Sequence, residues 1–204
     1  MIKDLTFKFL GLTDYMETLE KMKNHIHSGS FQNEVWILEH KPVFTLGTAA
    51  DIKHIIDVKN IPVIKSDRGG EVTYHGPGQL VIYLLLDIKK SNLGPRSLIT
   101  NLQKFIQSLL KKYGIDSNFI EGAPGVYVNE MKIASIGLRI SNGRCYHGIS
   151  INVDMDLSPF NGINPCGYKQ LEVTQIKNFH KSITITQVKQ DTVIMMEDLF
   201  NNSI

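Results

Sequence analysis

The sequence predicts an α+β fold: one domain in which helices pack against a mixed, largely antiparallel sheet. Two observations lead to this prediction. Amphipathic helical patterns occur near both ends and in the middle of the chain, and short apolar strand patterns separated by turns fill the remainder. No internal repeat, low-complexity tract or linker interrupts the 204 residues, so we expect a single domain over residues 1–204.

The N-terminal part of the chain predicts one helix and two strands. Apolar residues recur at helical spacing over residues 14–27, with Thr13 available as the N-cap and Gly29 just beyond the last turn. The β-branched and aromatic runs 35–38 and 43–46 are typical of strands, and a proline-containing turn separates them. We therefore expect a helix followed by two consecutive strands.

The middle and the end of the chain supply the remaining elements. The continuous apolar run 80–86 predicts a buried strand, and residues 95–113 place apolar side chains along one face of a long helix. Three strand patterns follow within residues 125–153, and the Asn-Gly pair at 142–143 is a strong hairpin signal. Residues 186–200 again predict an amphipathic helix.

The composition limits the possible partners and location. The chain is 42% hydrophobic and 21% charged, with a formal charge of only +2, so nothing in it favours binding to nucleic acid or to a membrane surface. The charged N-terminus does not resemble a signal peptide, and no apolar run approaches the ~20 residues of a membrane span. We therefore expect a cytoplasmic protein.

A glycine-rich segment, residues 68–79 with the sequence RGGEVTYHGPGQ, directly precedes the buried strand. Four glycines in twelve residues make this segment costly to order, and such a cost is typical of a loop that shapes a ligand site. The segment is the first candidate for a binding site.

The two cysteines, Cys145 and Cys166, are too few for a disulfide framework or a structural zinc site, so each is expected to be a free thiol. Cys145 alternates with apolar residues of a predicted strand, which favours a buried thiol. Cys166 lies in the Asn-Pro-Cys-Gly bend at 164–167, which could present it to a cleft. For Cys166 a nucleophile and a buried small side chain both remain open from local context.

A nucleophilic thiol needs activation, because a thiol with a pKa of about 8.5 is only slightly ionised near neutral pH. Lys132 is the candidate, since it is a single charged residue at the start of an apolar, small-residue strand. The alternative is an ordinary solvated lysine at a strand edge. Spacing in the sequence does not by itself pair Lys132 with Cys166.

Three histidines, His40, His75 and His147, could in principle converge on a metal ion or serve a thiol as a base. None has the i, i+4 spacing of a helical metal pair, and no acidic residue completes a recognisable motif. We therefore expect no metal site and interpret these histidines as hydrogen-bonding groups.

Four motifs of unusual composition occur along the chain: RGG-x-x-TYHGPGQ at 68–79, KIASIG at 132–137, HG-x-x-x-N at 147–152 and NPCG at 164–167. Their order is the one seen in the lipoyl (octanoyl) transferases, the LipB family, and the chain resembles that family over its whole length. The segment LEHKPVFTLG at 38–47 also resembles the family's N-terminal signature.

The resemblance implies an acyltransferase of lipoate biosynthesis with the fold of biotin and lipoate protein ligase catalytic domains. Such enzymes move an octanoyl group from octanoyl-acyl carrier protein to a lysine of lipoyl domains. The acceptors it implies are the 2-oxoacid dehydrogenase complexes and the glycine-cleavage H protein. In this family the cysteine matching Cys166 carries an acyl-thioester intermediate, and the lysine matching Lys132 assists it. No cofactor is expected, because exchange of one thioester for another is nearly isoenergetic.

The resemblance also implies which residues contact the substrate. These are Arg68, Gly69, Gly70, Glu71, Val72, Thr73, Tyr74, His75, Ser135, Ile136, Gly137, Gly148, Ile149 and Ser150. The glycines suit this role, because each leaves out a side chain where an acyl chain must pass. For Arg68, contact with substrate and a structural role that bridges loop carbonyls or a carboxylate are both open.

Two other functions are considered. A lipoate- or biotin-protein ligase would have a similar fold but would adenylate a free acid with ATP and magnesium; the continuation 73–79 departs from the ligase motifs. A noncatalytic module that binds an acyl carrier or a lipoyl domain would tolerate replacement of Cys166.

Overall fold

The computed structural model describes residues 5–91, 93–120, 122–164 and 171–202, which form two sheets, four α-helices and two short 3-10 helices. The strands are β1 (Thr6–Thr13), β2 (Glu34–His40), β3 (Val43–Leu46), β4 (Val63–Lys65), β5 (Val72–His75), β6 (Gln79–Asp87), β7 (Asn118–Ile120), β8 (Ala123–Val128), β9 (Met131–Ser141) and β10 (Arg144–Asn152). The helices are α1 (Tyr15–His27), α2 (Pro95–Lys112), α3 (Ile176–Phe179) and α4 (Ile185–Asn202), and the 3-10 helices are η1 (Ile52–His54) and η2 (Ser158–Gly162).

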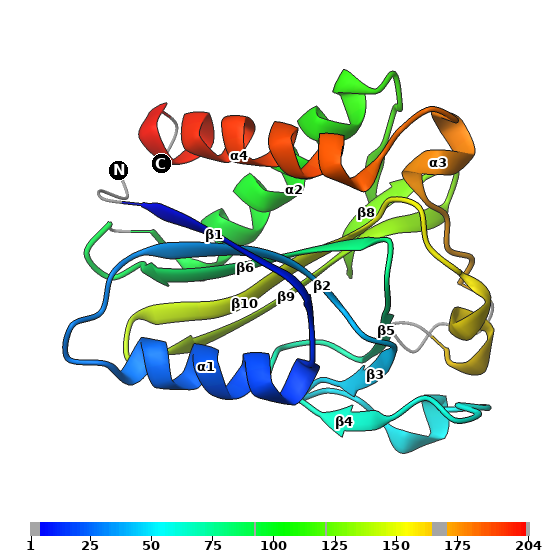
Figure 1. Ribbon diagram of the computed structural model, residues 1–204, viewed down its shortest axis with the longest axis horizontal. Coiled ribbons are helices and arrows are strands. Elements are labelled where there is room, and N and C mark those ends of the chain that lie inside the picture. Colours follow the sequence, from blue (N-terminus) through cyan, green and yellow to red (C-terminus); the bar gives the residue numbers. More distant parts are fainter. Residues whose placement is uncertain (1–4, 92, 121, 165–170, 203–204) are drawn as a thin grey trace.

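The predicted α+β fold is confirmed. A seven-stranded mixed sheet in the order β1-β2-β6-β10-β9-β8-β7 forms the centre, and a small sheet in the order β4-β3-β5 lies beside it. Helices α2 and α4 cover one face of the large sheet, whereas α1 covers the other (Figure 1). The largest apolar core lies between the large sheet and the α2–α4 pair. A smaller core under α1 includes tyrosine and tryptophan side chains.

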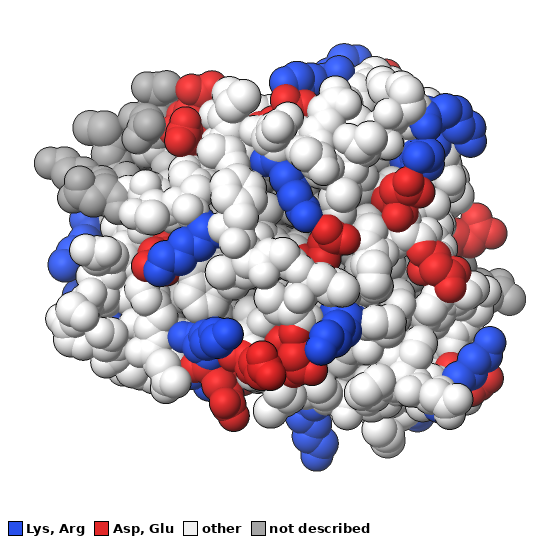
Figure 2. All heavy atoms as spheres, in the orientation of Figure 1, with Lys and Arg blue, Asp and Glu red and all other residues white. Residues whose placement is uncertain are grey.

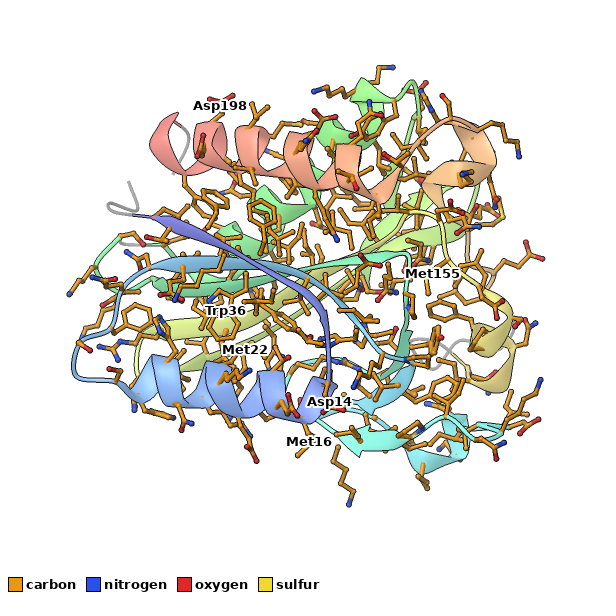
Figure 3. All side chains as sticks on the ribbon, in the orientation of Figure 1. Asp14, Met16, Met22, Trp36, Met155 and Asp198 are labelled. Atoms are coloured by element: carbon orange, nitrogen blue, oxygen red, sulfur yellow. The ribbon has the colours of Figure 1, made fainter. Side chains whose placement is uncertain are left out.

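Helix α1 begins one residue later than predicted and has a different cap. The Asp14 side chain, rather than that of Thr13, accepts hydrogen bonds from the backbone N–H groups of Met16 and Glu17. An aspartate at this position also favours the positive end of the helix dipole. Met22 faces the sheet beside Trp36, whereas Met16 lies on the solvent side (Figure 3).

The sequence did not predict β1, β5 or the three-residue strands β4 and β7. β1 is an edge strand whose side chains are mostly exposed, so it lacks the apolar alternation that marks a half-buried strand. β5 lies inside the glycine-rich segment 68–79, where the glycines obscure its four-residue pattern. The two strands predicted in succession, β2 and β3, belong to different sheets, because the chain crosses from one to the other at the turn between them.

The three strands predicted near the C-terminal half are confirmed as β8, β9 and β10, which pair antiparallel. The turn at 142–143 joins β9 to β10, with both Asn142 and Gly143 at positive φ, as an Asn-Gly hairpin turn requires. Within β10, His147 has φ 60, so the backbone turns there and the regular alternation of side chains is broken.

Charges on the surface are mixed. On the face shown in Figure 2, lysines and arginines are interspersed with aspartates and glutamates. Among the described residues, no helix is both long and apolar enough to span a membrane.

Candidate active site

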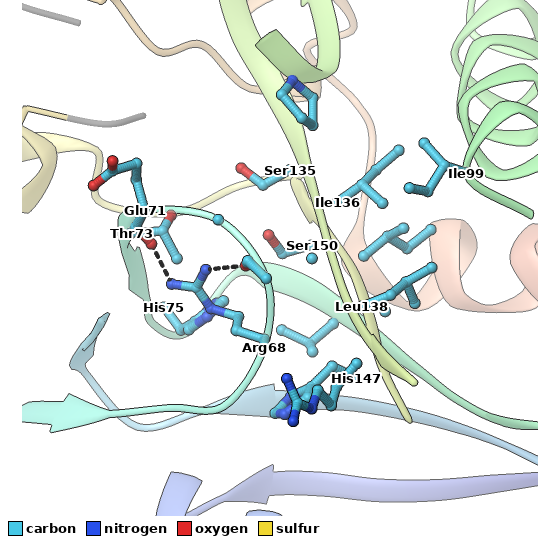
Figure 4. A pocket seen from close by; sticks show the side chains of 18 of the residues that line it. Arg68, Glu71, Thr73, His75, Ile99, Ser135, Ile136, Leu138, His147 and Ser150 are labelled. Atoms are coloured by element: carbon cyan, nitrogen blue, oxygen red, sulfur yellow. Dashed lines mark hydrogen bonds between the residues drawn. The ribbon is translucent and has the colours of Figure 1, made fainter. Parts of the chain in front are cut away.

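A cavity of about 610 Å³ lies between the glycine-rich segment and strands β9 and β10 (Figure 4). This volume falls within the ~300–1,000 Å³ typical of small-molecule sites. Its walls come from the loop before β5, from β5, β9 and β10, and from the start of α2, which contributes Pro95 and Ile99. Three separate parts of the sequence, the segment around β5, the start of α2 and the β9–β10 hairpin, therefore line one space.

Thirteen of the fourteen residues that the resemblance assigns to substrate contact line this cavity. They are Arg68, Gly69, Gly70, Glu71, Val72, Thr73, His75, Ser135, Ile136, Gly137, Gly148, Ile149 and Ser150. Tyr74 is the exception: its ring packs against Phe44 and Phe160 in a separate apolar cluster. Because successive side chains of a strand point to opposite sides, Thr73 and His75 can face the cavity while Tyr74 faces away.

Two glycines line the cavity at positions where neighbouring backbone segments approach closely. Gly137 on β9 pairs directly with Gly148 on β10, and Ser135 pairs with Ser150 two residues further along. A Cβ atom at Gly148 would overlap the carbonyl oxygen of Ile82, so only glycine fits between the two neighbouring strands. A Cβ at Gly137 would lie 3.1 Å from the carbonyl oxygen of Gly69 and would narrow the cavity.

Arg68 holds the shape of the glycine-rich loop. Its guanidinium donates hydrogen bonds to the carbonyl oxygens of Thr45 (2.8 Å), Gly69 (3.0 Å) and Glu71 (2.8 Å), and also to the Thr45 hydroxyl. Arg68 is buried, so these bonds compensate for its desolvation. The structural role left open by the sequence, a bridge between loop carbonyls, is the one that the geometry displays, although the side chain also lines the cavity.

Lys132 lines the cavity and is only 4% exposed. Its Nζ donates to the carbonyl oxygen of Pro124 at 2.9 Å and lies 5.7 Å from the centre of the Tyr127 ring. Its backbone N–H donates to the carbonyl of Glu172, and its own carbonyl accepts from Thr174. The alternative of a solvated lysine at the edge of a strand is therefore wrong, because the Lys132 side chain is buried and its backbone N–H and carbonyl groups both form hydrogen bonds.

Cys166 lies outside the described residues. The described chain on both sides of it is fixed by backbone hydrogen bonds. Before it, Asn164 donates to the carbonyl of His54 at 2.8 Å, and Ile163 pairs with Ile55. After it, residues 172–174 pair with Lys132.

Cys145 is fully buried, as the sequence predicted, and packs in the core under α2 and α4. Burial raises the pKa of its thiol to about 12, although a backbone hydrogen bond partly opposes this shift. Its Sγ lies 3.3 Å from the carbonyl oxygen of Leu84. Cys145 thus has the properties of a structural, unreactive thiol.

The three histidines lie near one another, and each has a hydrogen-bond partner within the protein. His40 Nε2 lies 2.7 Å from the Tyr83 hydroxyl, His75 Nδ1 lies 2.7 Å from the Gln79 side chain, and His147 Nε2 lies 2.8 Å from an Asp67 oxygen. Burial lowers the pKa of His40 to about 4 and that of His75 to about 3. In the part of the chain that the structure describes, no group of three or more acidic, histidine or cysteine side chains could hold a metal ion.

Sequence reasoning missed three polar residues of this region. Asp67 lies within hydrogen-bond distance of the His147 ring, and Tyr15 and Tyr83 line the cavity. Asp67 directly precedes the RGG motif, which is the one signal that could have indicated it. The two tyrosines lie in apolar patterns, where they cannot be distinguished from core residues.

Comparisons with known proteins bear on the family and the fold. The model of the lipoyl protein ligase A/B catalytic domain matches residues 13–196. An octanoyltransferase of Legionella pneumophila (strain Corby) is 52% identical over 186 residues, which cover 90% of this chain and 94% of that protein.

Two solved structures share the fold at low sequence identity. A lipoate-protein ligase A structure with bound ATP gives a TM-score of 0.79 at 13% identity and covers 96% of this chain and 85% of its own. A biotin protein ligase of Aquifex aeolicus gives a TM-score of 0.57 at 14% identity, and the match covers 97% of this chain and 69% of that ligase chain. The family match and the 52% identical relative extend over most of the chain. The chain therefore belongs to the lipoyl protein ligase A/B catalytic domain family and, within it, to the octanoyltransferases, which are acyltransferase enzymes.

Proposed function

We propose that the protein transfers an octanoyl group from octanoyl-acyl carrier protein to a lysine of lipoyl domains, through a thioester on Cys166. The acceptors would be the lipoyl domains of 2-oxoacid dehydrogenase complexes and the glycine-cleavage H protein, and the product would serve lipoate biosynthesis. The octanoyltransferase relative supports the acyl group, and the lipoyl ligase family supports a lipoyl-domain acceptor.

One observation supports this assignment of the reacting groups: the buried Lys132 at the cavity forms backbone hydrogen bonds with the segment that follows Cys166. Lys132 lines the cavity, and its backbone pairs with residues 172–174, which begin six residues after Cys166. The preceding flank is fixed at Asn164. A lysine near a thiol stabilises the thiolate, which is the nucleophilic form.

In the first half of the reaction, the Cys166 thiolate attacks the carbonyl carbon of the donor thioester. The bond from that carbon to the donor sulfur breaks, and the departing sulfur takes a proton from the Lys132 ammonium. One thioester replaces another, so the step needs no nucleotide. The enzyme then carries the octanoyl group and a neutral Lys132.

In the second half, the neutral amine of the acceptor lysine attacks the acyl carbon. Its N–H proton passes to Lys132, the bond from the acyl carbon to the Cys166 sulfur breaks, and an amide forms. The thiolate and the Lys132 ammonium are thereby restored. Formation of an amide from a thioester is downhill, which makes this step the one that drives transfer.

The cavity suits a medium-length acyl chain. Ile99, Ile136 and Leu138 supply an apolar wall, and the paired glycines Gly137 and Gly148 also line the cavity. Burial stabilises such a chain by roughly 0.8 kcal/mol per methylene. The apolar part of the cavity wall therefore suits the acyl group, while its polar residues remain available to the reacting end.

Mass spectrometry of the protein mixed with octanoyl-acyl carrier protein, without ATP, tests the proposal. We expect a covalent octanoyl adduct that is lost in Cys166→Ala and retained in Cys145→Ala, since Cys145 is buried in the core. Addition of a lipoyl domain should discharge the adduct and leave octanoyl on the acceptor. Transfer that appears only with ATP would replace this function by that of a ligase, and binding without transfer would indicate a noncatalytic module.

A further inference from the structure

A chain of buried hydrogen bonds connects His75 to the segment that holds Lys132. Nδ1 of His75 lies 2.7 Å from Oε1 of Gln79, and Nε2 of Gln79 donates to Oδ1 of Asn152 at 2.9 Å. Asn152 in turn donates from Nδ2 to the carbonyl oxygen of Thr174 at 2.9 Å, and the Thr174 N–H donates to the carbonyl oxygen of Lys132. The reaction steps above give no role to Gln79 or Asn152, although both side chains are buried.

The two amides fix which nitrogen of the His75 ring carries the hydrogen. Nε2 of Gln79 also donates to the carbonyl oxygen of Tyr74 at 3.2 Å, as Nδ2 of Asn152 does to that of Thr174. Backbone carbonyls only accept, so the NH₂ groups of both amides must point at them, which leaves Oε1 of Gln79 facing the ring. Because Oε1 also only accepts, Nδ1 of His75 donates, and the neutral ring has its lone pair on Nε2.

The His75 ring is neutral near neutral pH. Burial, with smaller contributions from His40, Arg68 and His147, lowers its pKa to about 3, although its side-chain hydrogen bond opposes the shift. The ring of Tyr15 stacks on it at 6.0 Å between centroids. With so low a pKa, the ring accepts a hydrogen bond at Nε2 without taking the proton of an amine.

Nε2 of His75 is open to the cavity. His75 lines the cavity and is 6% exposed, and within the described chain its Nε2 has no hydrogen-bond partner (Figure 4). Nδ1 of His147 is a fully covered atom without a partner, but Nε2 of His75 is not covered in this way. An accessible lone pair on a cavity wall favours a ligand that carries a hydrogen-bond donor.

The sheet brings His75 and Lys132 to the same edge. Gln79 begins β6, Asn152 ends β10 and Lys132 lies at the start of β9, and these three strands are adjacent. Asn152 pairs with Gln79, and the preceding residue of β10 pairs with Ala134 of β9, so the three strand ends lie level. Neighbouring strands are ~4.8 Å apart, so the hydrogen-bonded chain spans only the width of these strands.

The hydrogen-bond donors of the two substrates differ at the reacting atoms. A thioester presents a carbonyl oxygen and a sulfur there, and both only accept. The acceptor lysine presents an amine with N–H groups, which donate. An exposed acceptor on the cavity wall therefore suits the amine and not the acyl group. This step rests on the function proposed above, which supplies the two substrates.

We propose that Nε2 of His75 accepts one N–H of the acceptor lysine as its amine attacks the octanoyl thioester, and that Gln79 and Asn152 are positioning residues that hold His75 in the required tautomer. The hydrogen bonded to His75 stays on the nitrogen and becomes the amide hydrogen, while the other passes to Lys132. The contact orients the amine so that its lone pair faces the acyl carbon.

Two variants of His75 test the contact. Asparagine places its amide near the position of Nδ1, so His75→Asn keeps a donor for Gln79 but lacks the acceptor; glutamine reaches the position of Nε2, so His75→Gln supplies one. Each protein is mixed with octanoyl-acyl carrier protein and then with a lipoyl domain, and mass spectrometry follows formation and discharge of the octanoyl adduct. We expect His75→Asn to slow discharge about tenfold more than formation, as loss of one hydrogen bond predicts, and His75→Gln to recover most of the discharge rate.

Equal slowing of both steps by His75→Asn, or equal discharge by the two variants, overturns the inference. Absence of the adduct in the unmodified protein instead refutes the proposed function, so the two failures are distinguishable.

Gln79→Glu tests the positioning role through the pH profile. A carboxylate beside the ring favours its protonated form, in which Nε2 carries a hydrogen and cannot accept. The ratio of discharge rates, variant to unmodified protein, should therefore rise about tenfold between pH 6 and pH 8 as the ring loses this proton. Gln190→Glu, at an exposed position on α4, is the matched control and should give a constant ratio. A ratio for Gln79→Glu that is equally low at every pH would show a structural role alone and contradict positioning through His75.

Discussion

The two faces of the seven-stranded sheet are built from the same strands but differ in chemistry. Toward α2 and α4, β6 and β10 present aliphatic residues and the single thiol of Cys145. Toward α1 and the small sheet, the same strands present Tyr83, Tyr146 and Ser150. The face under α2 and α4 is therefore held mainly by apolar burial, and the other by a connected set of hydrogen bonds.

The difference shows what a catalytic cavity requires of a sheet. On the apolar face a side chain is replaceable by another of similar volume. On the polar face, Arg68 and the three histidines are buried and Asp67 is partly buried, and they must keep specific partners, because an unsatisfied buried group is costly. The predictions below test this contrast, from the largest expected effect to the smallest.

Lys132→Arg should have the largest effect, because it keeps a positive charge but removes a group able to take a proton. We expect octanoyl transfer to a lipoyl domain to fall by about 10²–10⁴-fold, the usual contribution of general acid–base catalysis. The measurement is kcat/KM with octanoyl-acyl carrier protein. Lys111→Arg, at an exposed position on α2, is the matched control. Near-normal transfer by Lys132→Arg would contradict a proton-transfer role for this residue.

Gly148→Ala and Gly137→Ala should distinguish a glycine required for stability of the fold from one required for function of the cavity. The first places a methyl group against the Ile82 carbonyl and should lower the free energy of unfolding by about 3 kcal/mol. The second meets the Gly69 carbonyl at 3.1 Å and the Arg68 side chain at 3.3 Å, and it should cost about 1 kcal/mol while it weakens octanoyl transfer. Urea denaturation measures both variants.

Gly29→Ala is the control for these two variants, because nothing lies within 4 Å of a Cβ at that position. Its unfolding free energy should change by less than about 0.5 kcal/mol. Equal destabilisation by all three substitutions would show that the close approach of the strands at Gly148 is unimportant.

Acid should destabilise the polar face through His40 and His75. Their pKa values, lowered chiefly by burial to about 4 and about 3, lie below the ordinary value of 6.5. Below pH 6.5 the unfolded chain therefore takes up protons that the folded protein does not. The stabilisation that comes from keeping His40 and His75 neutral in the folded protein is complete above pH 6.5 and is lost as the pH falls toward 4. We expect the free energy of unfolding to fall by about 2–4 kcal/mol between pH 7 and pH 5.

The double variant His40→Gln, His75→Gln tests the source of this pH dependence. It should remove at least half of the loss in unfolding free energy between pH 7 and pH 5, measured by urea denaturation. His27→Gln, at an exposed site, should leave the loss unchanged. If the double variant and the unmodified protein lose equal stability, the two histidines are not its cause.

Cys145→Ala should have the smallest effect. A buried atom is removed from the apolar face, so we expect a loss of about 1 kcal/mol in unfolding free energy and unchanged octanoyl transfer. Because burial raises the pKa of this thiol to about 12, iodoacetamide should modify it only after unfolding. Peptide mass spectrometry detects the modification, and rapid labelling of Cys145 in the folded protein would contradict its burial.

Local patterns were enough for the elements with strong periodicity. The apolar run of β6, the amphipathic face of α2 and the Asn-Gly turn before β10 each carry their signal within a few residues. β1 escaped prediction because an exposed edge strand has no buried face to mark it. The N-cap of α1 was misplaced by one residue because threonine and aspartate are both good caps, and only the backbone decides between them.

By itself, the sequence determined the α+β class, the main helices and strands, the burial of Cys145 and, through its ordered motifs, the octanoyltransferase family. Only the tertiary structure decided which residues meet. The contact of Asp67 with His147 joins residues 80 apart, and the pairing of Lys132 with residues 172–174 spans about half that separation. Such contacts depend on strand register and on the approach of separate segments, which no local pattern encodes.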